Sequence, residues 1–217
     1  MNKKNQKSIL VLLFLATIFL LSQKAFCRIS AGLCPKVEYE TIIKSPIEYH
    51  DYLGKWYEII RDKSVIFQNG TCASAYYCLN KDGFINVFNQ ELRGRTLIKA
   101  NGEARLTKDY NRLTVSFAGG HWKDYDKGEY RIINTDFKNY SVVYSCKQKD
   151  EKNKIELVWV LARDPKKISE DILKSWINYL DTKFSYKSEE LIVTKHDTSK
   201  CMLVDARDKK IKRDILC

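Results

Sequence analysis

The chain has 217 residues, and its 38 lysines and arginines against 27 acidic residues give a formal net charge of +11. No Pro/Gly/Ser-rich linker, low-complexity tract or helical repeat divides it, which argues for one domain and against a repeat protein. The basic residues are spread over predicted turns and alternate strand positions. This is the pattern of a solvated surface, so we expect no nucleic-acid partner.

Residues 1–25 are predicted to be a secretory signal peptide, with basic residues ahead of an apolar run from 9 to 21. That run is shorter than the ~20 residues of a membrane-spanning helix. Cleavage would remove the lysines at positions 3, 4, 7 and 24 and lower the net charge to +7. We therefore expect a secreted protein whose cysteines form disulfides.

Alternating apolar and polar residues predict eight strands in the mature chain, separated by turn signals such as Asp82-Gly83. The runs are Trp56–Arg61, Ser74–Asn80, Phe84–Leu92, Leu97–Arg105, Arg112–Ala118, Glu129–Thr135, Ser141–Lys147 and Ile155–Arg163. Eight strands of this kind predict an all-β fold, an antiparallel up-and-down β-barrel. Such a barrel has no open edges and can hold one small ligand.

A C-terminal α-helix is predicted after Ser169, a capping residue followed by two acidic residues. It is expected to pack on the barrel wall with one apolar face: Ile172, Leu173, Trp176, Ile177, Leu180 and Phe184. Residues 202–217 form a basic tail, with its densest cluster at 209–213. We interpret the tail as solubilising; the alternative is weak contact with an anionic membrane surface or partner.

Three motifs in this pattern resemble those of the lipocalin family. They are Gly54-x-Trp56 at the start of the first strand, a turn containing Thr135, Asp136, Asn139 and Tyr140, and Arg163 after the last strand. The resemblance covers residues 34–201, the predicted domain, and is strongest to the apolipoprotein D-like and bacterial members of the family. It implies that the three motifs meet at the closed end of the barrel, with the Arg163 guanidinium stacked on the Trp56 indole.

The same resemblance implies two disulfides, Cys34–Cys146 and Cys72–Cys201. Three further cysteines, Cys27, Cys78 and Cys217, depart from the subgroup's pattern. If cleavage removes Cys27, the other two form a third pair or stay free, and the sequence leaves this open. Asn69-Gly70-Thr71 matches the N-glycosylation acceptor pattern in a polar loop. Asn139-Tyr140-Ser141 also matches, but Asn139 is expected to be engaged within the signature turn.

Carried over from the family, the ligand site is an aromatic cup with polar residues near one rim, an arrangement suited to an amphipathic ligand. Its predicted members are Tyr77, Asn89, Glu91, Arg93, Tyr130 and Trp159. Alternation along the third strand places Asn89, Glu91 and Arg93 on one face. The alternative for the last two is that they only pair with each other.

No constellation of an enzyme or metal site is apparent. His50, His121 and His196 are isolated, and no serine lies in a nucleophile elbow. Cys78 is the candidate for a reactive thiol, but the family alignment turns Tyr77 inward, so Cys78 should face outward. We therefore expect no catalysis, no cofactor and no metal.

The predicted function is that of a secreted, monomeric lipocalin that carries a small hydrophobic or amphipathic molecule such as a fatty acid, lysolipid or sterol. Two alternatives remain: a lipid-modifying enzyme that uses a thiol, and a pigment or tetrapyrrole binder.

Overall fold

The computed structural model describes residues 29–65, 67–117, 128–197, 199–202, 204–207 and 209. The predicted signal peptide, Cys27, His121, Cys217 and most of the basic tail lie outside this part of the chain.

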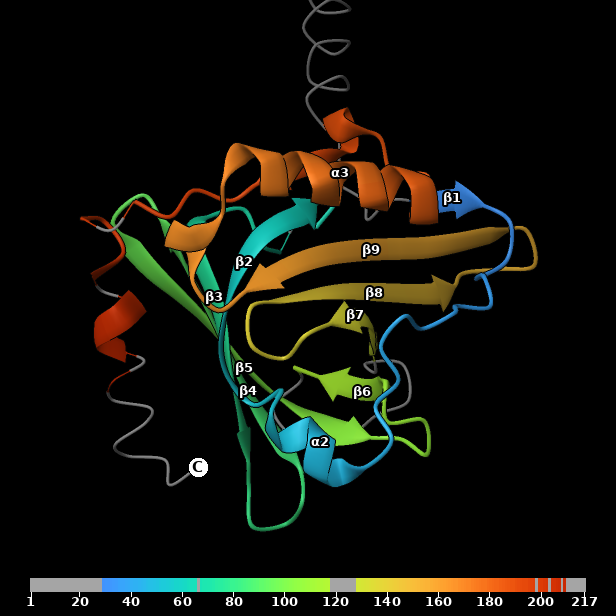
Figure 1. The fold of residues 1–217 in the computed structure, drawn as a ribbon, viewed down its shortest axis with the longest axis horizontal. Coiled ribbons are helices and arrows are strands. Elements are labelled where there is room, and N and C mark those ends of the chain that lie inside the picture. Colours follow the sequence, from blue (N-terminus) through green and yellow to red (C-terminus); the bar gives the residue numbers. More distant parts are fainter. Residues whose placement is uncertain are drawn as a thin grey trace, which may run out of the picture.

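The described residues form a closed antiparallel β-barrel with an α-helix along one side, which confirms the predicted fold (Figure 1). Eight long strands follow one another around the barrel, and β9 pairs with β2 to close it. They are β2 Gly54–Asp62, β3 Thr71–Leu79, β4 Ile85–Arg93, β5 Thr96–Leu106, β6 Arg112–Ser116, β7 Gly128–Thr135, β8 Tyr140–Gln148 and β9 Asn153–Ala162.

Two short strands were not predicted. β1, Ile29–Ala31, pairs with β9, and β10, Leu191–Val193, pairs with β2. Each has three residues, which is too short for an alternating pattern to stand out in the sequence. Their pairing partners are far away in the chain, so these strands form only when the barrel folds and places β9 beside β1 and β2 beside β10.

A β-bulge interrupts the pairing of β2 with β9 between Glu58 and Ile60. Without it, strict alternation would turn Arg61 to the face opposite Glu58. With the extra residue, both side chains lie on the same face, and Arg61 Nη1 donates to Glu58 Oε1 at 2.8 Å. The bulge therefore allows a buried ion pair at the cavity wall.

The short helix α2, Pro46–His50, leads into the first barrel strand. Ser45 caps it by accepting from the backbone N–H of Glu48, and Pro46 begins it. Gly54 then has a φ of +90°, a left-handed conformation that an L side chain rarely adopts, so the chain can turn sharply into β2. Behind that turn, Tyr52 and Trp56 are completely buried and fill this end of the barrel.

The long helix α3, Glu170–Phe184, packs against the outer face of β2, β8 and β9 (Figure 1). Ser169 accepts from the backbone N–H of Ile172, as the sequence predicts. Leu180 is fully buried between the helix and the strands. Ile172 is the exception in the predicted apolar face, because it is exposed in the first turn of the helix. Single 3-10 turns at Pro165–Lys167 and Ser188–Glu190 flank the helix.

The chain ends outside the barrel are fastened covalently. Cys34 is bonded to Cys146 and Cys72 to Cys201, across 112 and 129 residues of sequence. The packed unit extends past residue 201, since Val204 is buried beside Leu92. Among the described residues, no helix combines the length and apolar character that a membrane span requires.

Candidate functional site

The closed end of the barrel is built around Trp56 and Arg163. The guanidinium carbon of Arg163 lies 3.7 Å from the centre of the indole, the stacking that the family resemblance implied. Its three nitrogens donate to the backbone carbonyls of Asp51, Lys55 and Phe137, at 2.7, 2.8 and 3.1 Å. One side chain thus connects the entry to β2 with the turn between β7 and β8.

That turn is organised by Asp136. Its Oδ1 accepts from the backbone N–H groups of Lys138, Asn139 and Tyr140, and its Oδ2 from the Asn139 side chain. Partial burial raises the pKa of Asp136, but the donors, Tyr140 N–H foremost, outweigh burial and lower it overall. Asn139 is therefore engaged locally, as expected for the signature turn. Thr135 completes it by donating to the Tyr140 carbonyl at 2.6 Å.

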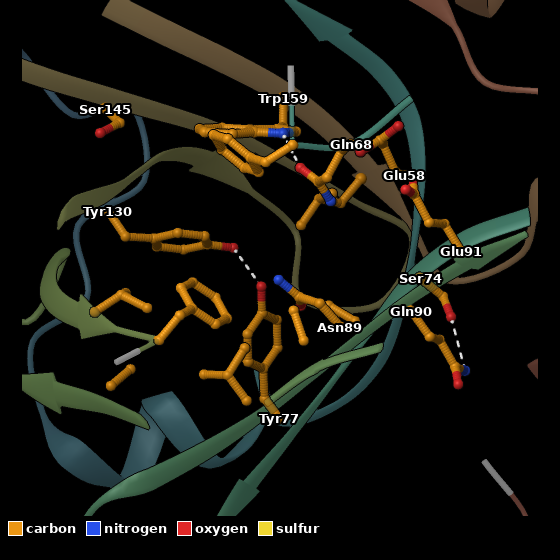
Figure 2. A pocket seen from close by; sticks show the side chains of 18 of the residues that line it. Glu58, Gln68, Ser74, Tyr77, Asn89, Gln90, Glu91, Tyr130, Ser145 and Trp159 are labelled. Atoms are coloured by element: carbon orange, nitrogen blue, oxygen red, sulfur yellow. Dashed lines mark hydrogen bonds between the residues drawn. The ribbon is translucent and has the colours of Figure 1, made fainter. Parts of the chain in front are cut away.

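Inside the barrel, beyond this floor, lies a cavity of about 470 Å³ (Figure 2). Most of its wall is apolar or aromatic, including Tyr49, Tyr77, Val87, Ala104, Leu113, Val115, Tyr130, Leu157, Trp159 and Leu161. Polar side chains concentrate on the wall formed by β2, β3 and β4 and on the loop that follows β2, including Glu58, Gln68, Ser74, Asn89 and Glu91. The cavity therefore has an apolar body with a polar side.

Three tyrosine hydroxyl groups meet at the inner end of the cavity. Tyr130 Oη lies 2.7 Å from Tyr52 Oη and 3.1 Å from Tyr77 Oη, and Tyr52 also reaches Ser141. Burial raises the pKa of Tyr52 to about 12 and raises the pKa values of Tyr77 and Tyr130 as well. All three are neutral phenols at physiological pH, so each can donate one hydrogen bond.

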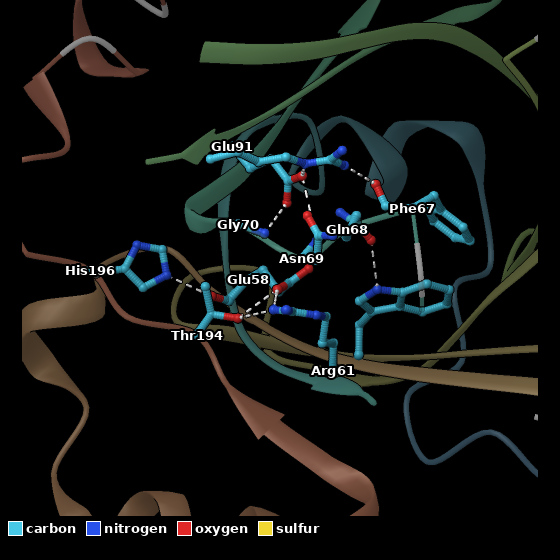
Figure 3. Close-up of polar contacts among 11 residues, drawn as sticks. Glu58, Arg61, Phe67, Gln68, Asn69, Gly70, Glu91, Thr194 and His196 are labelled. Atoms are coloured by element: carbon cyan, nitrogen blue, oxygen red, sulfur yellow. Dashed lines mark hydrogen bonds and ion pairs between the residues drawn. The ribbon is translucent and has the colours of Figure 1, made fainter. Parts of the chain in front are cut away.

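Glu58 is the buried charged group on the polar side. Its Oε1 accepts from Arg61 and from Thr194 Oγ1, and His196 Nε2 donates to its backbone carbonyl at 2.6 Å (Figure 3). Burial raises the pKa of the Glu58 carboxyl, against the lowering effect of Arg61. Among the described residues, no group hydrogen-bonds to its Oε2. An unsatisfied buried oxygen of this kind is unfavourable unless water or a ligand reaches it.

The loop from Lys63 to Gly70 joins β2 to β3 at the end of the barrel opposite Trp56. Phe67 and Gln68 from this loop line the cavity, and Trp159 Nε1 donates to Gln68 Oε1 at 3.1 Å (Figure 2). We call residues 67–70, the part of this loop that leads into β3, the mouth loop. Phe67 is exposed and lies at the open end together with Phe117, which follows β6.

Of the six residues predicted to bind ligand, five line the cavity: Tyr77, Asn89, Glu91, Tyr130 and Trp159. Arg93 does not. Alternation carries it to the same strand face as Glu91, but it is the last residue of β4, and its guanidinium turns to Glu91 and to the Phe67 carbonyl at the rim. The expected alternative, a Glu91–Arg93 pair, is present.

Several polar residues of the wall were not predicted from the sequence, Glu58 and Gln68 among them. Glu58 could have been found, because it lies two residues after the inward Trp56 on a predicted strand. Gln68 could not, since a loop has no periodicity that predicts which side chain points inward.

The thiol considered for catalysis lies outside the cavity. Cys78 is 1% exposed and packs with Tyr76 and Phe88 on the face opposite Tyr77, as alternation predicts. It is also disulfide-bonded. Within the described part of the chain, no group of three or more histidine, cysteine or acidic residues could hold a metal ion.

Comparison with known proteins places this barrel in a family. Residues 47–196 match the family model described as a lipocalin-like domain. Apolipoprotein D of Rattus norvegicus is 34% identical over 137 residues, which cover 62% of this chain and 68% of that protein. A bilin-binding protein of Pieris brassicae is 26% identical over 179 residues, 78% of this chain and 87% of that protein.

Solved structures show the same fold at lower sequence identity. Lobster apocrustacyanin A1 superposes with a TM-score of 0.64 at 15% identity, covering 79% of this chain and 92% of that one. Insecticyanin from the tobacco hornworm Manduca sexta also has a TM-score of 0.64, at 21% identity, covering 81% and 92%.

Proposed function

The chain belongs to the lipocalin family, and on that premise we propose that it binds and carries one small hydrophobic or amphipathic molecule in the barrel cavity, of the class of fatty acids, lysolipids and sterols. The observation that carries the proposal is the cavity of about 470 Å³, walled by aromatic and aliphatic side chains and closed by Trp56 and Arg163. Small-molecule sites have volumes of roughly 300–1,000 Å³ and are mainly apolar.

The polar side of the cavity favours a ligand with one polar group over a pure hydrocarbon. Glu58 Oε2 has no described hydrogen-bond partner, and the amide of Asn89 lies on the same wall (Figure 2). A ligand hydroxyl or other donor beside them would satisfy a buried acceptor that an apolar ligand would leave unpaired. We assign ligand contact to Tyr77, Asn89, Tyr130 and Trp159, with Glu91 on the wall beside them.

The test is the binding of an environment-sensitive fatty-acid probe. A dissociation constant in the micromolar range, about −8 kcal/mol, with quenching of tryptophan emission is the expected result. Trp159→Phe should remove most of the quenching, whereas Trp176→Phe, on α3 outside the barrel, is the matched control and should not. Native mass spectrometry of the purified protein should show a copurified small molecule. Failure of every apolar probe together with an empty mass spectrum would overturn the carrier function.

A pigment is the second candidate, favoured by the similarity to a protein named for bilin binding. Absorbance of the purified protein in the visible range separates the two, because a bound tetrapyrrole is coloured and a fatty acid is not. We assign no catalytic step to the site, since Cys78 does not line the cavity.

We further propose that the protein is secreted and is glycosylated at Asn69, an exposed residue of the mouth loop. Two disulfides within the described chain suit an oxidising compartment. Protein recovered from the medium of a glycosylating host should lose mass on treatment with an N-glycan-cleaving enzyme. Asn69→Gln should abolish that shift, while Asn139→Gln should leave it unchanged. A shift that persists in Asn69→Gln would place the glycan elsewhere.

A further inference from the structure

Two backbone N–H groups of the mouth loop, those of Asn69 and Gly70, point to one carboxylate, Glu91. Glu91 Oε2 accepts from the backbone N–H of Gly70 at 2.8 Å, and Oε1 accepts from Arg93 Nε at 2.7 Å and, more weakly, from Asn69 N–H at 3.5 Å (Figure 3). The Glu91 side chain is 5% exposed, so these donors replace the water it has lost. A head-group site would instead need those oxygens free to face a ligand.

Arg93 contacts the same loop at Phe67, which precedes Asn69 and Gly70 in the chain. Its Nη2 donates to the Phe67 carbonyl at 2.9 Å while its Nε remains on Glu91. The guanidinium thus bridges the end of β4 and the residue whose ring lies at the cavity mouth. A planar group with donors on two edges can make such a bridge, which a lysine cannot reproduce.

Gly70 permits the close approach of the loop backbone to β4. A Cβ added there would lie 2.4 Å from the Leu92 carbonyl oxygen and 3.0 Å from the Glu91 carboxyl. Only a residue without a side chain lets the loop backbone lie against β4 at this point. Trp159 on β9 supplies the third attachment through Gln68.

From these contacts we infer that Glu91 and Arg93 are positioning residues that hold the mouth loop, with Phe67 and Gln68, against the open end of the cavity and thereby set how fast ligand enters and leaves. The inference rests on the proposed carrier function. It reassigns Arg93 from contact with a ligand head group to control of the loop.

The chain contains a matched control pair. Arg131 donates to Glu129 at 2.9 and 3.0 Å, two residues apart on β7, just as Arg93 and Glu91 are two residues apart on β4. Glu129 also borders the cavity. None of the described contacts of Arg131 involves the mouth loop, so Arg131→Ala removes an equivalent ion pair without releasing the loop.

The experiment measures association and dissociation rates of two probes by stopped-flow fluorescence: a fatty-acid probe and the alcohol of the same chain length. In Glu91→Gln and Arg93→Ala, both rates should rise about five- to tenfold for both probes, with equilibrium affinity changed less than about threefold. A loop that opens more often admits and releases ligand faster in equal measure. Arg131→Ala should leave both rates unchanged.

Other outcomes overturn the inference separately from the carrier function. Unchanged rates in both variants, with probe still bound, would show that the loop does not limit exchange. A selective loss of affinity for the carboxylate probe in Arg93→Ala would make Arg93 a head-group ligand.

Failure of both probes to bind the wild-type protein would overturn the carrier function alone. Hydrogen exchange of the ligand-free protein then still tests whether Glu91 positions the mouth loop. Glu91→Gln should raise exchange at the amides of Asn69 and Gly70, and protection equal to wild type would remove Glu91 from that role. Arg93, whose side chain is 40% exposed, provides the variant least prone to unfolding.

Discussion

At the closed end of the barrel, Tyr52 and Trp56 have no exposed surface, whereas at the open end the equivalent interior space is the cavity itself. Burial of large aromatic side chains stabilises the first region directly. The second region cannot use that source of stability, because filling it would remove the binding site. It is held instead by the two disulfides on its outer side and by the contacts of Glu91 and Arg93.

The two ends therefore differ in what holds them together: buried aromatic side chains at the closed end, and disulfides and polar contacts at the open end.

The largest effect is expected for Trp56→Ala, at about 3–5 kcal/mol of unfolding free energy. The substitution removes a fully buried indole and the surface on which Arg163 stacks. Urea unfolding monitored by circular dichroism measures the loss. Trp176→Ala, on the partly buried face of α3, is the control and should lose less. Equal losses for the two variants would contradict the role of Trp56 as the floor of the barrel.

Removal of the open-end disulfide in the double variant Cys72→Ser/Cys201→Ser should cost about 2–4 kcal/mol, because the bond closes a loop of more than 100 residues. The consequence should be local in the native state: hydrogen exchange should increase in the mouth loop and the start of β3. The signature turn around Asp136 should stay protected. Loss of protection at both ends alike would mean that the two regions are not separate.

Arg163→Lys should cost about 2 kcal/mol, since lysine keeps the charge but cannot donate to three carbonyls while stacked on an indole. Chemical denaturation gives the free energy of unfolding, and titration with the fatty-acid probe gives the affinity of the folded fraction. That affinity should match wild type. Weakened binding by folded Arg163→Lys protein would show that the floor also shapes the cavity.

The smallest effect concerns Asp136, whose lowered pKa links the signature turn to pH. A carboxyl with a depressed folded-state pKa contributes stability above its ordinary value of 3.8 and loses it as pH falls through the folded-state pKa. Asp136→Asn should therefore cost about 1–2 kcal/mol at pH 7, and the cost should shrink as the pH falls below 3.8.

Unfolding free energies of the two proteins across pH 2–7 test this convergence. Asp150→Asn, in the turn between β8 and β9 at the open end, is the matched control and should change less, because the hydrogen bonds from Asn153 and Lys152 that lower the pKa of that carboxyl are exposed to water. Parallel curves of unfolding free energy against pH for wild type and Asp136→Asn would show that Asp136 does not link stability to pH.

The long strands were predictable because each has one face toward the interior and one toward water. Apolar and polar residues therefore alternate along the sequence with a period of two. The floor was predictable from the family resemblance, since Gly54, Trp56 and Arg163 keep fixed places relative to the strand ends. The family resemblance placed Tyr77 inward, and alternation along the strand then placed Cys78 outward. These features need only local sequence and the closure of the sheet.

Other features depended on contacts between distant segments. The bulge after Glu58 shifts the register by one residue and brings Arg61 to the cavity side, which alternation alone would place outside. β1 and β10 exist through their pairing partners. Parity put Arg93 on the correct strand face, but the choice between cavity and rim depended on Phe67, which lies in a loop without periodicity.

By itself, therefore, the sequence determined the order of the eight long strands, most of the apolar face of α3 and the residues of the closed end, because periodicity and short motifs encode those directly. Only the tertiary structure decided that Glu91 and Arg93 hydrogen-bond to the mouth loop, that Glu58 borders the cavity beside an ion pair, and that Val204 packs beside Leu92. Each of these rests on hydrogen bonds or packing between side chains and backbone groups far apart in the chain, and no local pattern records such pairings.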